Sequence, residues 1–171
     1  MEDHHFHFPE PTQAGIALGS NLGKSDLILS KAISQLQELH LGPPSTFLVS
    51  SLYKTAPVNC PPHSPNFLNA VIQLEISLSS YDLIDFLQKI EAEAGRTLPR
   101  IQNTPRTLDL DLLYHGTEIL TSDLLTLPHP RILEREFVLG PLSEIAPHFT
   151  LPGWKKTARE YLLDLKINNI N

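Results

Sequence analysis

Two aspartates two residues apart, Asp109 and Asp111, stand inside the apolar run Leu108 to Tyr114. In a β-strand, residues i and i+2 point to the same face. Both carboxylates would therefore project together, while the alternating Leu108, Leu110 and Leu112 face the other way. Neighbouring negative charges repel, and carboxylates are rarely buried without a partner. A divalent cation relieves that repulsion, and Mg²⁺ is typically held by one or two carboxylates plus substrate phosphates. With Arg106 just before the strand, the pattern predicts a nucleotide–magnesium site.

The same spacing also fits a solvated face of an antiparallel sheet, so the aspartates alone do not decide. The charge distribution favours a site, although 13 Lys+Arg against 19 Asp+Glu give a net charge of −6. Five of the six arginines fall within residues 96–135, beside the aspartates: Arg96, Arg100, Arg106, Arg131 and Arg135. Arginine recognises phosphate in a planar, bidentate manner. A local cluster in an acidic chain suits a small polyanion better than duplex nucleic acid, so we expect no nucleic-acid partner.

The composition bounds the class of protein. A chain of 171 residues fits one domain, and we expect a single catalytic domain over 14–171 after a disordered leader over 1–13. No stretch is apolar enough for a membrane helix or a signal peptide, so no membrane partner is expected. The single cysteine fits a reducing compartment, which predicts a cytoplasmic protein, and we expect a monomer. Three histidines in the leader (His4, His5 and His7) leave metal binding there as an alternative.

Hydrophobic spacing and turn residues predict the order of elements. We expect strands at 16–18, 46–53, 67–76 and across the aspartates, and helices over 25–39 and from Ser79 or Ser80 to Gly95. Loops are expected over 56–66 and 96–105, a hairpin turn at 114–118 into 119–120, and helices near 134–139 and 157–166. This order predicts an α+β fold with a ferredoxin-like core (βαββαβ), a mostly antiparallel sheet packed with helices, and an extra C-terminal hairpin and helices.

Seven stretches resemble one family in their order along the chain. They are Ala17-Leu-Gly-Ser-Asn-Leu22, Leu52-Tyr-Lys-Thr55, Phe67-Leu-Asn-Ala70, Ile90-Glu with Gly95-Arg96, Pro105-Arg-Thr-Leu-Asp-Leu-Asp111, Leu127-Pro-His129 and Phe137-Val-Leu-Gly-Pro-Leu142. The family is 6-hydroxymethyl-7,8-dihydropterin pyrophosphokinase, an enzyme of folate biosynthesis, and the resemblance covers roughly residues 14 to 150. It implies transfer of the β,γ-diphosphate of ATP to the hydroxymethyl group of a reduced pterin, with release of AMP.

The resemblance also implies a role for each matching residue. Two Mg²⁺ ions would be held by Asp109 and Asp111, and the implied catalytic residues are Arg96, Arg106, Asp109 and Asp111. The implied ATP-binding residues are Ile84, Gln88, Glu91, Arg96, Arg106, Leu112, Thr126, His129 and Arg135. The implied pterin-binding residues are Thr55, Ala56, Val58, Phe67, Asn69 and Phe137. The two phenylalanines would stack on the bicyclic ring while the Asn69 amide reads its edge.

Taken from the residues alone, several of these positions have plainer interpretations. Either phenylalanine of the stacking pair fits core packing, and His129 fits a structural loop residue. The helical pair Gln88 and Glu91 also fits an exposed polar face.

The loop after Arg96 departs from the family pattern. The family has two arginines and a tryptophan where this chain has Leu98, Gln102 and Asn103. This loop and the 56–66 loop are the expected lids over the substrates.

Two other classes of protein remain open at this point. A ligand-sensing module on a ferredoxin-like fold would explain the topology, but not an aspartate pair beside five arginines. A D-x-D nucleotidyl or glycosyl transferase would share the metal site but not the slot of Phe67, Asn69 and Phe137.

Overall fold

The computed structural model describes residues 10–57, 61–96 and 105–168. The strands are β1 (Thr12–Ser20), β2 (Leu48–Val49), β3 (Tyr53–Thr55), β4 (Phe67–Ile76), β5 (Asp109–His115), β6 (Leu120–Thr121) and β7 (Thr126–Leu127). The α-helices are α1 (Ser25–Gln37), α2 (Ser80–Glu93), α3 (Glu136–Ile145) and α4 (Ala158–Asn168). Short 3₁₀ turns are η1 (Pro44–Thr46) and η2 (Ile132–Glu134).

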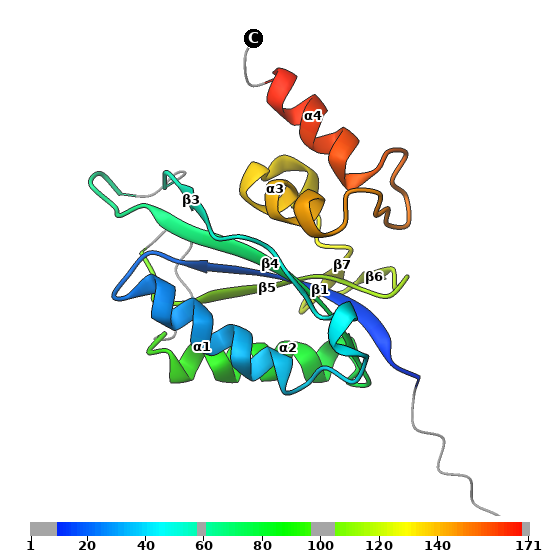
Figure 1. Cartoon of the computed structure of the whole chain (residues 1–171), viewed down its shortest axis with the longest axis horizontal. Coiled ribbons are helices and arrows are strands. Elements are labelled where there is room, and N and C mark those ends of the chain that lie inside the picture. Colours follow the sequence, from blue (N-terminus) through cyan, green and yellow to red (C-terminus); the bar gives the residue numbers. More distant parts are fainter. Residues whose placement is uncertain (1–9, 58–60, 97–104, 169–171) are drawn as a thin grey trace, which may run out of the picture.

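Strands β1 to β5 form one antiparallel sheet in the order β2–β4–β1–β5, in which β3 also pairs with β4. Helices α1 and α2 cover one face of this sheet, and α3 and α4 lie on the other (Figure 1). A separate apolar core fills each side, as expected for helices layered on both faces of a sheet. The predicted α+β class with a mostly antiparallel sheet is confirmed.

Alternation along the strands decides which residues enter which core. Leu108, which precedes β5, and Leu110 and Leu112 within it belong to the core under α1 and α2, whereas Leu113 belongs to the core under α3. The aspartates are out of phase with these leucines, as period-2 alternation predicts. They therefore lie on the α3 face of the sheet.

Helix α2 begins and ends where its capping residues predict. The Oγ of Ser79 accepts a hydrogen bond from the N–H of Asp82 at 3.2 Å, and Gly95 follows the helix with a φ of +86°. These are the side-chain N-cap and the left-handed residue that commonly end a helix. The buried side chains Leu83, Leu87 and Ile90 recur at helical spacing on the face toward the sheet.

Three predicted elements are wrong in detail. The leader predicted to run to residue 13 ends earlier, because β1 begins at Thr12 and Thr12 pairs with Ile76. The strand predicted over 46–53 is split, because the hydroxyl of Ser50 accepts the Val71 N–H at 3.0 Å and interrupts the regular ladder. The helix predicted near 134–139 instead begins at Glu136 and continues to Ile145.

The hairpin predicted between the aspartate strand and residues 119–120 is also wrong. Strand β6 pairs with β7, not with β5, in a small second sheet. A tight turn closes this hairpin, because Ser122 accepts the Leu125 N–H on its hydroxyl and donates its own N–H to the Leu125 carbonyl. The sequence contains a hairpin, but between a different pair of strands.

Within the described ranges, no helix is both long and apolar enough to cross a lipid bilayer.

Candidate active site

The site lies on the α3 face of the sheet, where three strands bring polar side chains together. In the sheet, Gly19 of β1 lies opposite Asp109 of β5 on one side and opposite Asn69 of β4 on the other. Only the strand β1 therefore lies between Asp109 and Asn69. Phe67, Asn69 and the core residue Val71 alternate along β4 and share that face. A Cβ at Gly19 would lie 3.1 Å from Oδ1 of Asn69, so the glycine keeps the floor of the site open.

A pocket on this face, here called the aspartate pocket, contains most of the predicted chemistry. Its lining residues come from β1, β3, β4, β5, α3, and the segments that follow β3 and precede β5 and α3. The site residues among them are Thr55, Ala56, Phe67, Asn69, Arg106, Asp109, Asp111, Arg131, Arg135 and Phe137. Nine of these ten were predicted, and Arg131 was noted only as an additional cation.

Arginines hold both aspartates. Oδ1 of Asp109 accepts a hydrogen bond from Nη1 of Arg96 at 2.5 Å, and Nε of Arg106 lies 3.3 Å from Oδ2 of Asp109. Asp111 receives Nη1 of Arg135 at 3.0 Å. Burial acts to lower the pKa of Arg96, but the charge and hydrogen bond of Asp109 and the charge of Glu91 outweigh it and raise that pKa. The two carboxylates are thus each held in place by an arginine at the wall of the site.

Glu91 lies behind this pair and is almost fully buried. Its Oε1 accepts the Leu110 N–H at 2.8 Å and a short hydrogen bond from Nη1 of Arg96. Glu91 lines neither of the two pockets described here. The interpretation of residues 88 and 91 as one exposed face is wrong for Glu91, which is only 2% exposed. Its predicted contact with ATP stays a prediction, while its observed contacts position Arg96 and β5.

Asn21 fixes the backbone of Arg106. The Asn21 Oδ1 accepts the Arg106 N–H at 2.8 Å, and the Asn21 N–H donates to the Arg106 carbonyl at 3.1 Å. The Nε of Arg106, although near Asp109, is buried without an aligned hydrogen bond among the described residues. A buried donor without an aligned acceptor is costly, and the charge of the Asp109 carboxylate at 3.3 Å offsets part of that cost.

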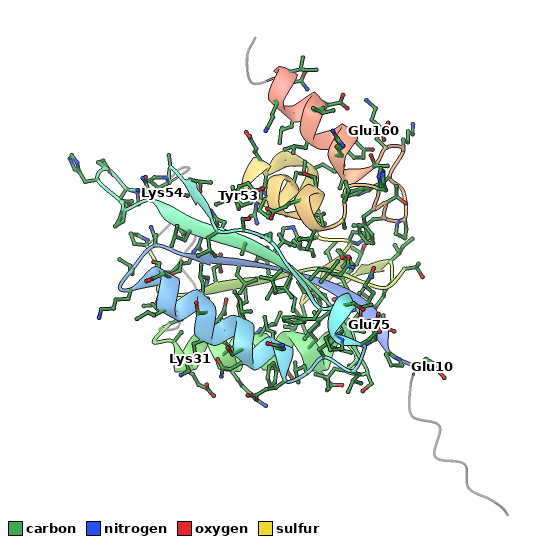
Figure 2. All side chains as sticks on the ribbon, viewed as in Figure 1. Glu10, Lys31, Tyr53, Lys54, Glu75 and Glu160 are labelled. Carbon is green, nitrogen blue, oxygen red and sulfur yellow. The ribbon has the colours of Figure 1, made fainter. Side chains whose placement is uncertain are left out.

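Glu144 joins two walls of the aspartate pocket, strand β3 and helix α3. The Tyr53 side chain reaches from β3 toward α3 (Figure 2), where its hydroxyl donates to Glu144 at 2.8 Å. The N–H and Oγ of Ser51 donate to the other carboxylate oxygen at 3.0 and 2.8 Å. Burial acts to raise the pKa of Glu144, but these hydrogen bonds outweigh it and hold that pKa below its usual value. Glu144 thereby ties β3, with Thr55, to the helix that begins beside Phe137.

A second pocket, here called the histidine pocket, lies between α2, β5 and the β6–β7 hairpin. Five predicted ATP-binding residues line it: Ile84, Gln88, Leu112, Thr126 and His129. Asp111 lines it too, and also lines the aspartate pocket. Leu87, Leu124 and Leu125 add apolar walls suited to a flat base. Asp111 therefore marks the junction of the two pockets.

The backbone of Arg131 decides which ring nitrogen of neutral His129 carries the hydrogen. Its Nδ1 accepts the Arg131 N–H at 3.1 Å, so the neutral ring carries its hydrogen on Nε2. Burial lowers the pKa of His129, and the charges of Arg135 and Arg131 lower it further against the opposing effect of Asp111. The neutral ring can donate one hydrogen bond from Nε2 to an anionic ligand.

The residues present fit a magnesium site that relies on its substrate. Among residues 10–57, 61–96 and 105–168, no three His, Cys, Asp or Glu side chains form a ready-made cage. The two partly exposed carboxylates, 21% and 30% accessible, would therefore need oxygens from phosphate and water. This is the mode of binding typical of Mg²⁺ in nucleotide enzymes.

The predicted residues fall into three groups. The structure brings together Thr55, Ala56, Phe67, Asn69, Arg106, Asp109, Asp111, Arg135 and Phe137 in one pocket, and Ile84, Gln88, Leu112, Thr126 and His129 in the adjoining one. Arg96 and Glu91 lie behind Asp109 and line neither pocket. Val58 lies outside the described residues, as do Leu98, Gln102 and Asn103 of the predicted lid.

Sequence reasoning missed the two residues that hold the site in shape, Asn21 and Glu144. Asn21 follows β1, but its side chain bonds to the backbone of Arg106 and Pro65, which are 85 and 44 residues away in the chain, so no local pattern predicted these contacts. Glu144 resembles any other acidic residue on a helix surface, and only the tertiary structure shows its contacts with Ser51 and Tyr53.

This fold and site define a class of protein: an α+β domain in which a paired-carboxylate, arginine-rich pocket adjoins a second pocket with apolar walls. A family model described as 7,8-dihydro-6-hydroxymethylpterin-pyrophosphokinase (HPPK) matches residues 15–147. The chain belongs to this family.

Similar proteins agree with this assignment. A 2-amino-4-hydroxy-6-hydroxymethyldihydropteridine pyrophosphokinase of Haemophilus influenzae is 46% identical over 143 residues, 82% of this chain and 85% of the relative. A protein of the same name from Bacillus subtilis is 42% identical over 132 residues, 77% of each chain. A solved structure of Plasmodium falciparum HPPK-DHPS shares the fold, with a TM-score of 0.71 over 93% of this chain and 13% identity. This chain spans 46% of that larger protein.

Proposed function

We propose that this chain transfers the β,γ-diphosphate of ATP to the hydroxymethyl group of 6-hydroxymethyl-7,8-dihydropterin and releases AMP, a step of folate biosynthesis. Relatives that are 46% and 42% identical over most of the chain have the corresponding enzyme name. The single observation that carries the proposal is the placement of Asp109 and Asp111. Both line the aspartate pocket, Asp111 also lines the histidine pocket, and arginines are paired to both.

Each pocket suits one substrate. The histidine pocket has apolar walls for adenine, and the Nε2–H of His129 can donate to a phosphate. The aspartate pocket has Phe67, Phe137 and the Asn69 amide for a flat, hydrogen-bonding bicycle. ATP bound in the first pocket would pass its phosphates by Asp111 toward the pterin hydroxyl.

In the proposed reaction the hydroxymethyl oxygen bonds to the β-phosphorus while the bond from that phosphorus to the α–β bridging oxygen breaks. AMP leaves with the bridging oxygen. Magnesium ions held by Asp109 and Asp111 would neutralise charge on the phosphates. Arg106 and Arg135, already in the pocket, orient the phosphates, and catalysis is mainly positioning and charge neutralisation. We assign no side chain as a general base.

The function is tested by AMP release from purified protein given ATP, Mg²⁺ and 6-hydroxymethyl-7,8-dihydropterin, with each omitted in turn. AMP formed only when all three are present is the expected result. Formation of ADP in its place would indicate ordinary kinase chemistry. Absence of turnover would overturn the proposal and, if an ATP analogue and the pterin still bound, would leave a binding-only relative.

We expect the pterin and ATP pockets to be separable by mutation. Asn69→Ala should raise the KM for the pterin ~10- to 100-fold, because the ring edge loses hydrogen bonds from a nearly buried amide. The KM for ATP should stay within about twofold, since Asn69 does not line the histidine pocket. Steady-state kinetics with each substrate varied in turn measures both constants. Equal effects on the two KM values would contradict the assignment of the slot.

The remaining assignments are also proposals. The strand order β2–β4–β1–β5, with antiparallel neighbours, supports a ferredoxin-like core. We further propose one catalytic domain, which begins with β1 at Thr12 and not at residue 14, a monomer, and a cytoplasmic location, the last supported by the single cysteine.

A further inference from the structure

Arg131 differs from the other arginines of the site in how its charge is used. Arg96 and Arg106 are ion-paired to Asp109, and Arg135 is ion-paired to Asp111. Arg131 also lines the aspartate pocket, but its Nε pairs with Glu134 at 3.2 Å. Both side chains of that pair are more than half exposed, at 55% and 65%. Among the described residues, the terminal amino groups of Arg131 make no hydrogen bond.

The energetics favour recruitment of this cation by an incoming anion. A solvent-exposed ion pair contributes only about 0–1 kcal/mol, so the contact with Glu134 is weak. A charge-assisted, bidentate bond from arginine to a phosphate is stronger. The backbone of Arg131 is held, because its N–H donates to Nδ1 of His129, while the side chain is free to turn. Arg131 is therefore an anchored cation with a weak counterion.

The position of Arg131 determines which phosphates of a bound nucleotide it can contact. It lines the aspartate pocket and not the histidine pocket, whereas Asp111 lines both. A nucleotide whose base lies in the histidine pocket would place its α-phosphate at the junction and its β- and γ-phosphates beyond it. We propose that Arg131 binds the diphosphate that is transferred, leaving Glu134 when the β- and γ-phosphates arrive. This inference rests on the proposed function.

Glu134 becomes a competitor under this proposal. Its carboxylate holds Arg131 when the pocket contains no phosphate, so its removal should favour phosphate binding. The two partners of one surface ion pair are therefore expected to have opposite effects on nucleotide affinity. A purely structural ion pair would give effects of the same sign.

The test compares AMP with α,β-methylene-ATP, a non-hydrolysable analogue, by calorimetry in the presence of Mg²⁺. Arg131→Gln should weaken binding of the ATP analogue about tenfold and change AMP binding less than about twofold. Glu134→Gln should tighten binding of the analogue about two- to threefold. Arg159→Gln, which removes the same charge from α4, is the matched control and should change neither. A thermal melt of each variant checks that the fold is kept.

Three outcomes would overturn the role of Arg131: an equal loss for AMP and the analogue, no loss in Arg131→Gln, or weakened binding in both Arg131→Gln and Glu134→Gln. The measurement needs no turnover. If the wild-type protein bound the analogue but released no AMP with the pterin, the proposed function would fail while the comparison still decided the role of Arg131. Absence of any nucleotide binding by the wild-type protein would overturn both.

Discussion

Replacement of Asp109 or Asp111 with asparagine is expected to lower AMP release at least ~10³-fold. Asparagine keeps the shape of the side chain but removes the charge that Mg²⁺ requires. Each aspartate lines the aspartate pocket, and Asp111 also borders the histidine pocket. Neither carboxylate can stand in for the other, because each is held by its own arginine, Arg96 for Asp109 and Arg135 for Asp111. Release of AMP is measured at saturating ATP and pterin.

The fold should survive both substitutions, since the aspartates are partly exposed and the flanking Leu108, Leu110 and Leu112 keep their core contacts. Asp164→Asn is the matched control, an identical change at an exposed ion pair on α4. It should leave turnover unchanged. Turnover of Asp109→Asn or Asp111→Asn within tenfold of the wild type, with AMP measured directly, would refute the metal assignment.

The sequence predicted that the two aspartates share one face of the sheet, opposite the leucines. Alternation along a strand is a local property, so the separation of Asp109 and Asp111 from Leu110 and Leu112 could be foreseen and is confirmed. The start of α2 was equally readable, because the Ser79 hydroxyl caps its own helix within three residues.

Pairing between distant segments could not be predicted in the same way. Strand β6 contains only Leu120 and Thr121, and nothing in two residues specifies β7 over β5 as its partner. The ion pairs of Arg96 and Arg135 depend on which side chains the folded sheet brings near, which is not visible in their spacing along the chain. The resemblance supplied most site residues, whereas the contacts that hold them came from the structure.

The structural role of Glu91 could not be predicted from its helical spacing. Its replacement should strongly reduce the stability of the fold. Glu91→Ala is expected to reduce the free energy of unfolding by ~3–5 kcal/mol, because it leaves the buried Leu110 N–H without its acceptor and takes one counterion from Arg96. Such a loss is a large fraction of the 5–15 kcal/mol that stabilises most domains. Urea unfolding followed by circular dichroism measures the change.

The control for Glu91 lies two residues further along the same helix. Glu93 is exposed, and its Oε2 accepts only a surface hydrogen bond from Gln35 at 2.9 Å among the contacts described. Glu93→Ala should therefore cost less than ~1 kcal/mol. Glu91→Gln, which keeps an acceptor for the Leu110 N–H but loses the charge, should fall between the two. Its KM for ATP should rise, since Arg96 would lose the charge of one of its two described carboxylate partners. If Glu91→Ala were no more destabilising than Glu93→Ala, Glu91 would not be the support for Arg96 and β5 that its contacts indicate.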